Sequence, residues 1–275
     1  MKKIAKGLLM VALGLLVATA ANAYDPTTYV AGSGVNNTAH DLSVPGIHGM
    51  NYPASPADPY QRMCIWCHAP HNTYRASVAN GGPNGLGAGP QASDAFDYLP
   101  LWNHTLQSDT AYSMYWNGTG APQTGANASQ AIALTMTPGS TSLLCLSCHD
   151  GSVAVNAYGN VNQPATSQSG GGIPISPGYV IGQDLYLGNH HPIGFSYAAA
   201  ASIDTGLRPV TTVMTQGGST IADHLYGVGG TVECGTCHSV HNQGNTGEEF
   251  LWRSDRQSRL CTTCHTKGAY SNTFP

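Results

Sequence analysis

Apolar residues are scattered along most of this chain and rarely fall at the spacing of a long helix or strand. Two segments are apolar enough to predict short helices, at 129–136 and 195–203. Runs rich in Gly, Asn and Ser, such as 80–92 and 117–129, predict loops. The pattern therefore predicts a mostly irregular fold with short helices.

The longest apolar run lies at residues 8–18, after three lysines and before the small-residue sequence Ala21-Asn22-Ala23. A basic start, an apolar stretch and a small-residue cleavage site are typical of a secretory signal peptide. We therefore predict a signal peptide at 1–23, a mature chain that starts near Tyr24, and export. The alternative, an uncleaved anchor, is disfavoured because this run is shorter than a membrane span. No later run approaches that length, so we expect no membrane span in the mature chain.

Composition limits the kind of interior that this chain can build. Of 275 residues, 34 are Gly and 17 are Pro, and only 9% are charged. So many helix breakers argue against a helix-rich enzyme. A net charge of −4 without a basic run argues against a nucleic-acid partner. With four Phe and four Trp, side chains alone supply little aromatic core, so another group must organise the fold.

All eight cysteines fall in four Cys-x-x-Cys pairs, and a histidine follows every pair. Cys-x-x-Cys-His is the attachment motif of c-type haem, in which two thiols bind the porphyrin and the histidine takes one axial position on iron. The sequence therefore predicts four covalently attached haems c, and that each motif opens a helical turn. The motifs are Cys64, Cys67 and His68; Cys145, Cys148 and His149; Cys234, Cys237 and His238; and Cys261, Cys264 and His265.

Three other uses of paired cysteines fit the sequence less well. Exported cysteines often form disulfides, but a disulfide framework places no demand on the residue after each pair. A zinc ribbon needs two pairs at a spacing that only the last two pairs approach, which leaves the other two unexplained. Thiol redox chemistry needs a thioredoxin-like context that a chain so rich in Gly and Pro does not offer.

The motifs repeat in pairs. Residues 64–72, CIWCHAPHN, match 234–242, CGTCHSVHN, and a Leu-Trp pair and then a second motif preceded by leucine follow each of them. The repeat predicts two units, the first lengthened by insertions. The expected divisions are an N-terminal arm at 24–60, a first haem-pair unit at 61–156, a linker at 157–178 and a second haem-pair unit at 179–275.

Four six-coordinate irons need four axial ligands besides the motif histidines. His71 and His241 each lie three residues after a motif histidine, which puts them on the same face of a helical turn. Neither can reach the opposite face of the iron that its neighbour binds. Each must therefore bind a different haem, which brings two haems close together. The other favoured ligands are His104, His40 and His191.

The remaining histidines, His48, His190 and His224, are expected at the surface or in supporting positions. The second unit has Ser254 where the first has His104, so it must take a ligand from elsewhere. Methionine is a weaker alternative as sixth ligand, given the surplus of histidines. The methionines of the mature chain are Met50, Met63, Met114, Met136 and Met214.

In this order, HDLS, CIWCHAPHN, PLWNH, LCLSCHDGSVAV, HHPI, ECGTCHSVHN and LCTTCH resemble the multihaem cytochromes c with doubled CXXCH motifs, over residues 38–266. Within that group, four motifs on an exported, loop-rich chain are most similar to the OmcE-type extracellular filaments. The resemblance implies a haem-organised fold with a continuous row of bis-histidine haems. It also implies that one subunit donates a histidine to its neighbour, for which His40 in the 24–60 arm is the candidate here.

Three classes of function are compatible with these features. The first is an extracellular filament, a head-to-tail homopolymer that conducts electrons between redox partner cytochromes and an acceptor such as a metal oxide. The second is a soluble electron shuttle in the periplasm. The third is a multihaem reductase, which needs an iron with an open position. The surplus of histidines disfavours that enzyme, so electron transfer without catalytic residues is expected, outside the cell or at its outer surface.

Overall fold

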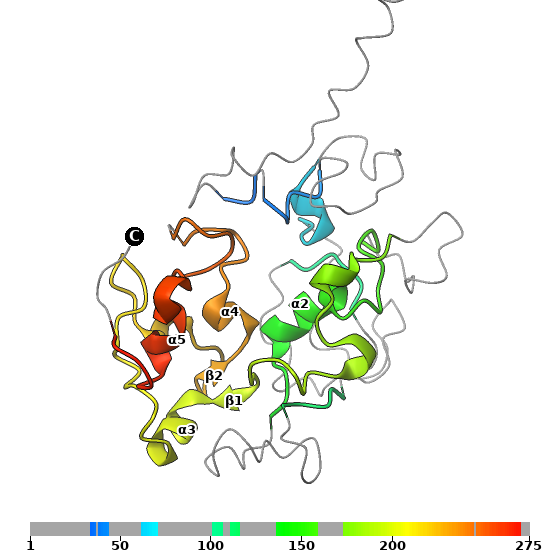
Figure 1. Cartoon of the computed structure of the whole chain (residues 1–275). Coiled ribbons are helices and arrows are strands. Elements are labelled where there is room, and N and C mark those ends of the chain that lie inside the picture. Colours follow the sequence, from blue (N-terminus) through cyan, green and yellow to red (C-terminus); the bar gives the residue numbers. More distant parts are fainter. Residues whose placement is uncertain are drawn as a thin grey trace, which may run out of the picture.

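The computed structural model describes residues 34–36, 38–43, 62–70, 101–106, 111–115, 136–158, 173–244 and 246–270. Most of these residues lie in turns and loops, with short helices and a two-stranded sheet (Figure 1). The α-helices are α2 (Ser140–His149), α3 (Tyr197–Ile203), α4 (Cys234–Cys237) and α5 (Arg259–Cys264), and the strands are β1 (Phe195–Ser196) and β2 (Thr231–Val232). The 3-10 helices are η3 (Cys64–Trp66), η5 (Pro177–Tyr179), η6 (Gln183–Leu185), η7 (Ile221–His224) and η8 (Arg256–Ser258). The prediction of a mostly irregular fold with short helices is confirmed for this part of the chain.

The segment 195–203 is part strand and part helix. Phe195–Ser196 forms β1, which pairs antiparallel with β2 and places Phe195 opposite Val232. The helix α3 begins at Tyr197, where the Ser196 hydroxyl accepts a hydrogen bond from the N–H of Ala199 at 3.4 Å. The predicted helix is therefore confirmed from Tyr197 onward, and its first two residues form an edge of the sheet instead.

One hydrophobic core joins the two predicted units. Met114 and Met136 from the first unit pack with residues of the second, and both methionines are buried. The core residues are Tyr112, Met114, Met136, Leu143, Leu146, Leu187, Phe195, Tyr197, Ala200, Ile221 and Val232. Met136 is the described end of the predicted helix 129–136, and it is not helical. The shared core means that the first and second haem-pair units fold against one another.

Both described ends of the predicted linker 157–178 pack on the first unit. The Thr105 N–H donates to the Ala157 carbonyl, and the Val155 N–H donates to the Ile173 carbonyl, each at 2.8 Å. The middle of this linker and the predicted signal peptide lie outside the described residues. Within the described ranges, no helix is both long and apolar enough to cross a membrane.

Candidate haem sites

Each Cys-x-x-Cys-His motif forms a turn of helix. In three motifs the histidine N–H donates to the carbonyl of the first cysteine: His68 to Cys64 at 2.8 Å, His238 to Cys234 at 3.1 Å and His265 to Cys261 at 2.9 Å. The first and third motifs begin their helices, as predicted, whereas the second and fourth lie at the ends of α2 and α5. In α2, burial of Leu143 and Leu144 explains why the helix starts upstream of the cysteines.

The first and third motifs pair with the segments that carry the Leu-Trp sequences. The Ala69 N–H donates to the Leu101 carbonyl at 3.0 Å, and the Ser239 N–H donates to the Phe250 carbonyl at 2.8 Å. Leu101 and Phe250 therefore occupy equivalent positions, and both have a left-handed backbone, with φ of 53° and 58°. The sequence repeat is thus also a repeat of backbone hydrogen bonding.

By sequence, Leu101 corresponds to Leu251. By hydrogen bonding it corresponds to Phe250, so the two alignments differ by one residue. Counted from Leu101 and Phe250, His104 corresponds to Arg253 and not to Ser254. Both side chains are fully buried, each 1% exposed. The second unit therefore carries a guanidinium where the first carries an imidazole.

The cysteines of successive motifs are neighbours. Cys67 interacts electrostatically with Cys148, Cys145 contacts Cys234, and Cys237 interacts with Cys264. The helices of the two central motifs, α2 and α4, lie side by side (Figure 1). The four motifs are therefore arranged in space in their sequence order. Cys64 and Cys261, at the two ends of this row, are exposed, whereas the six inner cysteines are partly buried.

The cysteines are unpaired, and burial changes the acidity of four of them. All eight cysteines are free of disulfides. Burial raises the pKa of Cys67, Cys148 and Cys237 to about 12 and that of Cys264 to about 11. These four thiols keep their protons at neutral pH. The described residues also contain no cluster of three or more His, Cys, Asp or Glu placed to hold a metal ion.

Three motif histidines each face a histidine from outside the motifs. The ring centroids lie 6.0 Å apart for His68 and His241, 6.1 Å for His149 and His40, and 6.3 Å for His265 and His191. Two imidazoles on opposite sides of one metal have ring centres about 6 Å apart, since each metal–nitrogen bond is about 2 Å long. These three pairs therefore fit the axial positions of three haem irons.

Backbone carbonyls orient two of these rings. The Nδ1–H of His149 donates to the Tyr179 carbonyl, and that of His191 donates to the Pro192 carbonyl, each at 2.9 Å. A carbonyl on Nδ1 fixes the tautomer and leaves Nε2 with the lone pair that binds a metal. His149 and His191 are therefore prepared to bind iron through Nε2.

Burial favours the neutral form of three of the paired histidines. Burial, and then the neighbouring His149, lowers the pKa of His40 to about 4. Burial also lowers the pKa of His241, with a further effect of His68, and the pKa of His265, with a further effect of His191. Neutral imidazole is the form that binds a metal.

The N-terminal arm docks on the loop after the third motif. The Asn242 side-chain amide donates to the Gly34 carbonyl at 3.1 Å, and the His40 ring packs against Phe250 with centroids 4.4 Å apart. This contact brings His40 to His149 of its own chain. Donation of His40 to a neighbouring subunit, which the resemblance implies, stays a prediction.

His238 is the motif histidine that faces no other histidine ring within the described part of the chain. Burial lowers the pKa of His238, and the Phe250 carbonyl opposes this effect. The remaining predicted ligand of this type, His71, lies outside the described residues. The structure therefore leaves the partner of His238 open.

His104 is buried beside the second motif and contacts two backbone carbonyls. Its Nδ1 lies 2.9 Å from the Thr105 carbonyl oxygen, and its Nε2 lies 3.0 Å from the Ala154 carbonyl oxygen. Cys148 Sγ lies 3.4 Å from the same Nε2. The described ring contact of His104 is with Trp102, with centroids 6.5 Å apart. His104 is thus the favoured ligand that the described structure does not bring into a pair.

The other histidines fit the supporting positions expected for them as far as they are described. His224 is buried, packs on Trp252 with centroids 4.7 Å apart, and lies 2.9 Å from the Ser219 hydroxyl through Nε2. His190 is partly buried, and His48 lies outside the described residues. Two of the methionine alternatives, Met114 and Met136, pack in the core that also contains Leu146 of the second motif.

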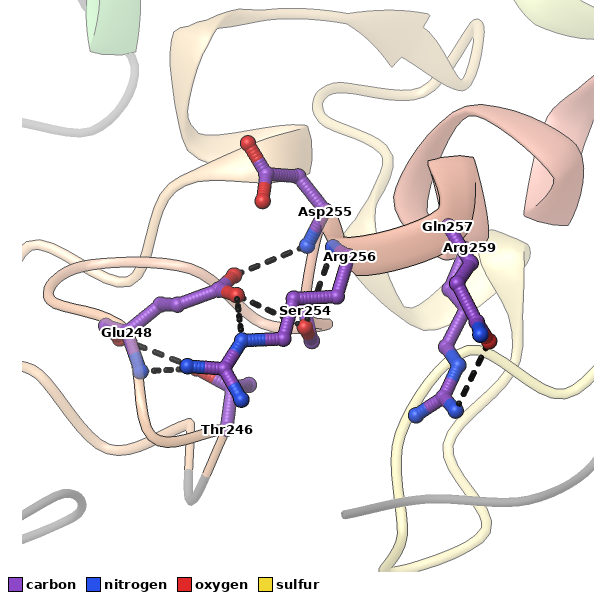
Figure 2. A network of polar contacts seen from close by, with 7 residues as sticks. All are labelled: Thr246, Glu248, Ser254, Asp255, Arg256, Gln257 and Arg259. Carbon is purple, nitrogen blue, oxygen red and sulfur yellow. Dashed lines mark hydrogen bonds and ion pairs between the residues drawn. The ribbon is translucent and has the colours of Figure 1, made fainter.

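A carboxylate joins the loop after the third motif to the start of the fourth (Figure 2). Glu248 accepts hydrogen bonds from the Ser254 hydroxyl and from the Asp255 N–H, each at 2.8 Å. Arg256 forms an ion pair with the same carboxylate at 3.4 Å, but its side chain is 79% exposed and the pair adds little stability. The hydrogen bonds from Ser254 and Asp255 instead fix the segment that leads into α5.

Two comparisons with known proteins bear on these sites. A search of curated proteins gives no match. Residues 227–270, which contain the third and fourth motifs, match the model of the doubled CXXCH motif. This match, on residues whose structure repeats the cysteine and histidine arrangement of the first two motifs, supports a multihaem c-type cytochrome with covalently attached haem.

Proposed function

We propose that the chain is an exported tetrahaem c-type cytochrome that transfers electrons along a row of four haems, each held between two histidines. When bound, haem supplies reversible one-electron chemistry at iron. The residues of the chain attach the haems and cap the irons. The observation that carries the proposal is the spacing of 6.0–6.3 Å in three pairs of histidines, each pair containing one motif histidine.

The proposed ligand sets link different parts of the chain. His241 follows the third motif but faces His68 of the first. The repeat then supplies His71, which follows the first motif, as the partner of His238 in the third. Such an exchange ties the first and third attachment sites to one another. The proposed axial pairs are His68 with His241, His149 with His40, His238 with His71, and His265 with His191.

Paired axial ligands favour electron transfer over catalysis. A reductase must leave one axial position open for its substrate. The three described pairs each offer two imidazoles, which leaves no open position at the first, second and fourth motifs. Bis-histidine ligation also gives lower reduction potentials than histidine with methionine, which suits delivery of electrons to an external acceptor.

The row of motifs has two exposed ends. Cys64 in the first motif and Cys261 in the last are exposed, and this supports electron exchange with other molecules at both ends. Contact between the first end of one subunit and the last end of the next would propagate without closing, as head-to-tail interfaces do. We therefore propose an extracellular filament, in which electrons pass between subunits and on to a redox partner cytochrome or a metal oxide.

A periplasmic shuttle is the second candidate, and the position of His40 favours it. In a filament of the kind implied by resemblance, a histidine crosses between subunits. Here His40 faces His149 of its own chain, so a single chain can complete the second site by itself. A self-sufficient monomer has no need to polymerise in order to bind its haems.

Electron microscopy of secreted protein separates the two candidates. The protein is produced in a host that attaches c-type haem, both as wild type and as His40→Ala. We expect filaments from both, with a high-spin haem in the variant, because His40 caps a haem of its own chain. Discrete particles of wild type, eluting from gel filtration as a single chain, would support the shuttle and contradict the filament.

A further inference from the structure

Glu233 immediately precedes the third motif, and its side chain reaches the helix of the second. The residue is 2% exposed. Both of its carboxylate oxygens lie 3.1 Å from the Gly139 nitrogen and accept from that N–H, and the Ser142 hydroxyl donates a short hydrogen bond to the same carboxylate. Gly139 is the N-cap of α2, and Ser142 lies in its first turn. Glu233 therefore caps the helix that ends in Cys145, Cys148 and His149.

The connection between the two motifs is reciprocal. The Ser142 hydroxyl oxygen accepts a hydrogen bond from the Cys234 N–H at 3.0 Å, so α2 also holds the first residue of α4. The Glu233 N–H donates to the Thr236 hydroxyl at 2.9 Å, which fixes the backbone that carries the carboxylate. Together these bonds form a clamp, defined here as Gly139, Ser142, Glu233 and the Cys234 N–H.

The clamp leaves little freedom at Gly139. A Cβ at this position would lie 2.6 Å from a carboxylate oxygen of Glu233, so a side chain there would displace the glutamate. The carboxylate is also well matched to its place, because the N-terminus of a helix favours negative charge and the hydrogen bonds are charge-assisted. Glutamine has one acceptor oxygen, and its amide group would direct a donor at the donors of α2.

We propose that Glu233 is a positioning residue that fixes the distance and orientation between the second and third haem attachment sites. The proposal rests on the proposed function, since it concerns two haems that the chain binds. Cys145 and Cys234, one from each site, are neighbours and lie close to the clamp in the sequence. A shift of α2 against α4 would therefore move one attachment site relative to the other, and electronic coupling between two haems weakens with their separation.

The test compares Glu233→Gln and Ser142→Ala, which break the clamp, with Asp255→Asn, which removes a carboxylate at an exposed position. Each protein is produced with haem, its haems are counted by intact mass, and the bisignate Soret circular dichroism of coupled haems is recorded. We expect four haems in every protein and a weakened bisignate band in the two clamp variants only. Ser142→Ala serves as the milder variant if Glu233→Gln is not recovered with haem.

The outcomes separate this inference from the proposed function. A clamp variant with four haems and the wild-type Soret band would overturn the role of Glu233. An equal loss in Asp255→Asn would also overturn it, because charge and not the clamp would be responsible. Fewer than four haems in the wild type would instead contradict the tetrahaem proposal.

Discussion

Replacing His241 with alanine is expected to open an axial position on the haem attached at Cys64 and Cys67, although His241 lies three residues after the third motif. The reason is that the His241 ring lies 6.0 Å from that of His68. Loss of one of two imidazole ligands converts ferric iron from low spin towards high spin, so about a quarter of the haem should change. Electron paramagnetic resonance of the ferric protein measures this fraction.

Removing one attachment site at a time shows which haem loses its ligand. In a chain that lacks Cys64 and Cys67, His241→Ala should cause no further increase in the high-spin signal. In a chain that lacks Cys234 and Cys237, the same substitution should still cause it. The reverse result would place His241 on the haem of its own motif and contradict the pairing.

His224→Ala is the matched control for this experiment. It removes a buried histidine that packs on Trp252 and lies near the Ser219 hydroxyl, away from the three histidine pairs. The control should keep low spin the three haems that the described histidine pairs would cap, those of the first, second and fourth motifs.

Replacing His104 with alanine is expected to destabilise the protein without changing its haems. The ring is 1% exposed and contacts the carbonyls of Thr105 and Ala154, which link the chain after the first Leu-Trp sequence to the segment after α2. Loss of a buried hydrogen bond and the cavity left behind together cost about 2–4 kcal/mol. Urea unfolding followed by tryptophan fluorescence measures the change.

The spectrum of the same variant decides whether His104 has a role as ligand. Haem count by mass and the low-spin ferric spectrum should equal those of the wild type. A new high-spin signal in His104→Ala would show that this ring binds iron, and would contradict its assignment as a packing residue.

The sequence predicts which residues attach haem better than it predicts which histidines face one another. Cysteine and histidine spacing alone is enough to predict the motifs and to argue that His241 serves a different haem from its neighbour. It does not indicate that His241 faces His68, because the two rings meet through tertiary packing of distant segments. For the same reason, sequence could rank His104 beside His40 and His191 but could not show that carbonyls surround its ring.

In the fold, too, local features follow from the sequence, whereas contacts between distant segments do not. The apolar run after Phe195 and the helical turns at the first and third motifs follow from local sequence. The one-residue shift between Leu101 and Phe250 does not, since both backbone positions are left-handed and neither residue favours that conformation. The role of Glu233 was also beyond sequence reasoning, because its partners Gly139 and Ser142 are distant in the chain.

Intact-mass spectrometry of the secreted protein tests the central claim most directly. Four haems attached through the four cysteine pairs should add the mass of four haem groups to a chain that begins near Tyr24. A mature chain that carries no haem, fewer than four haems, or zinc in their place would contradict the account.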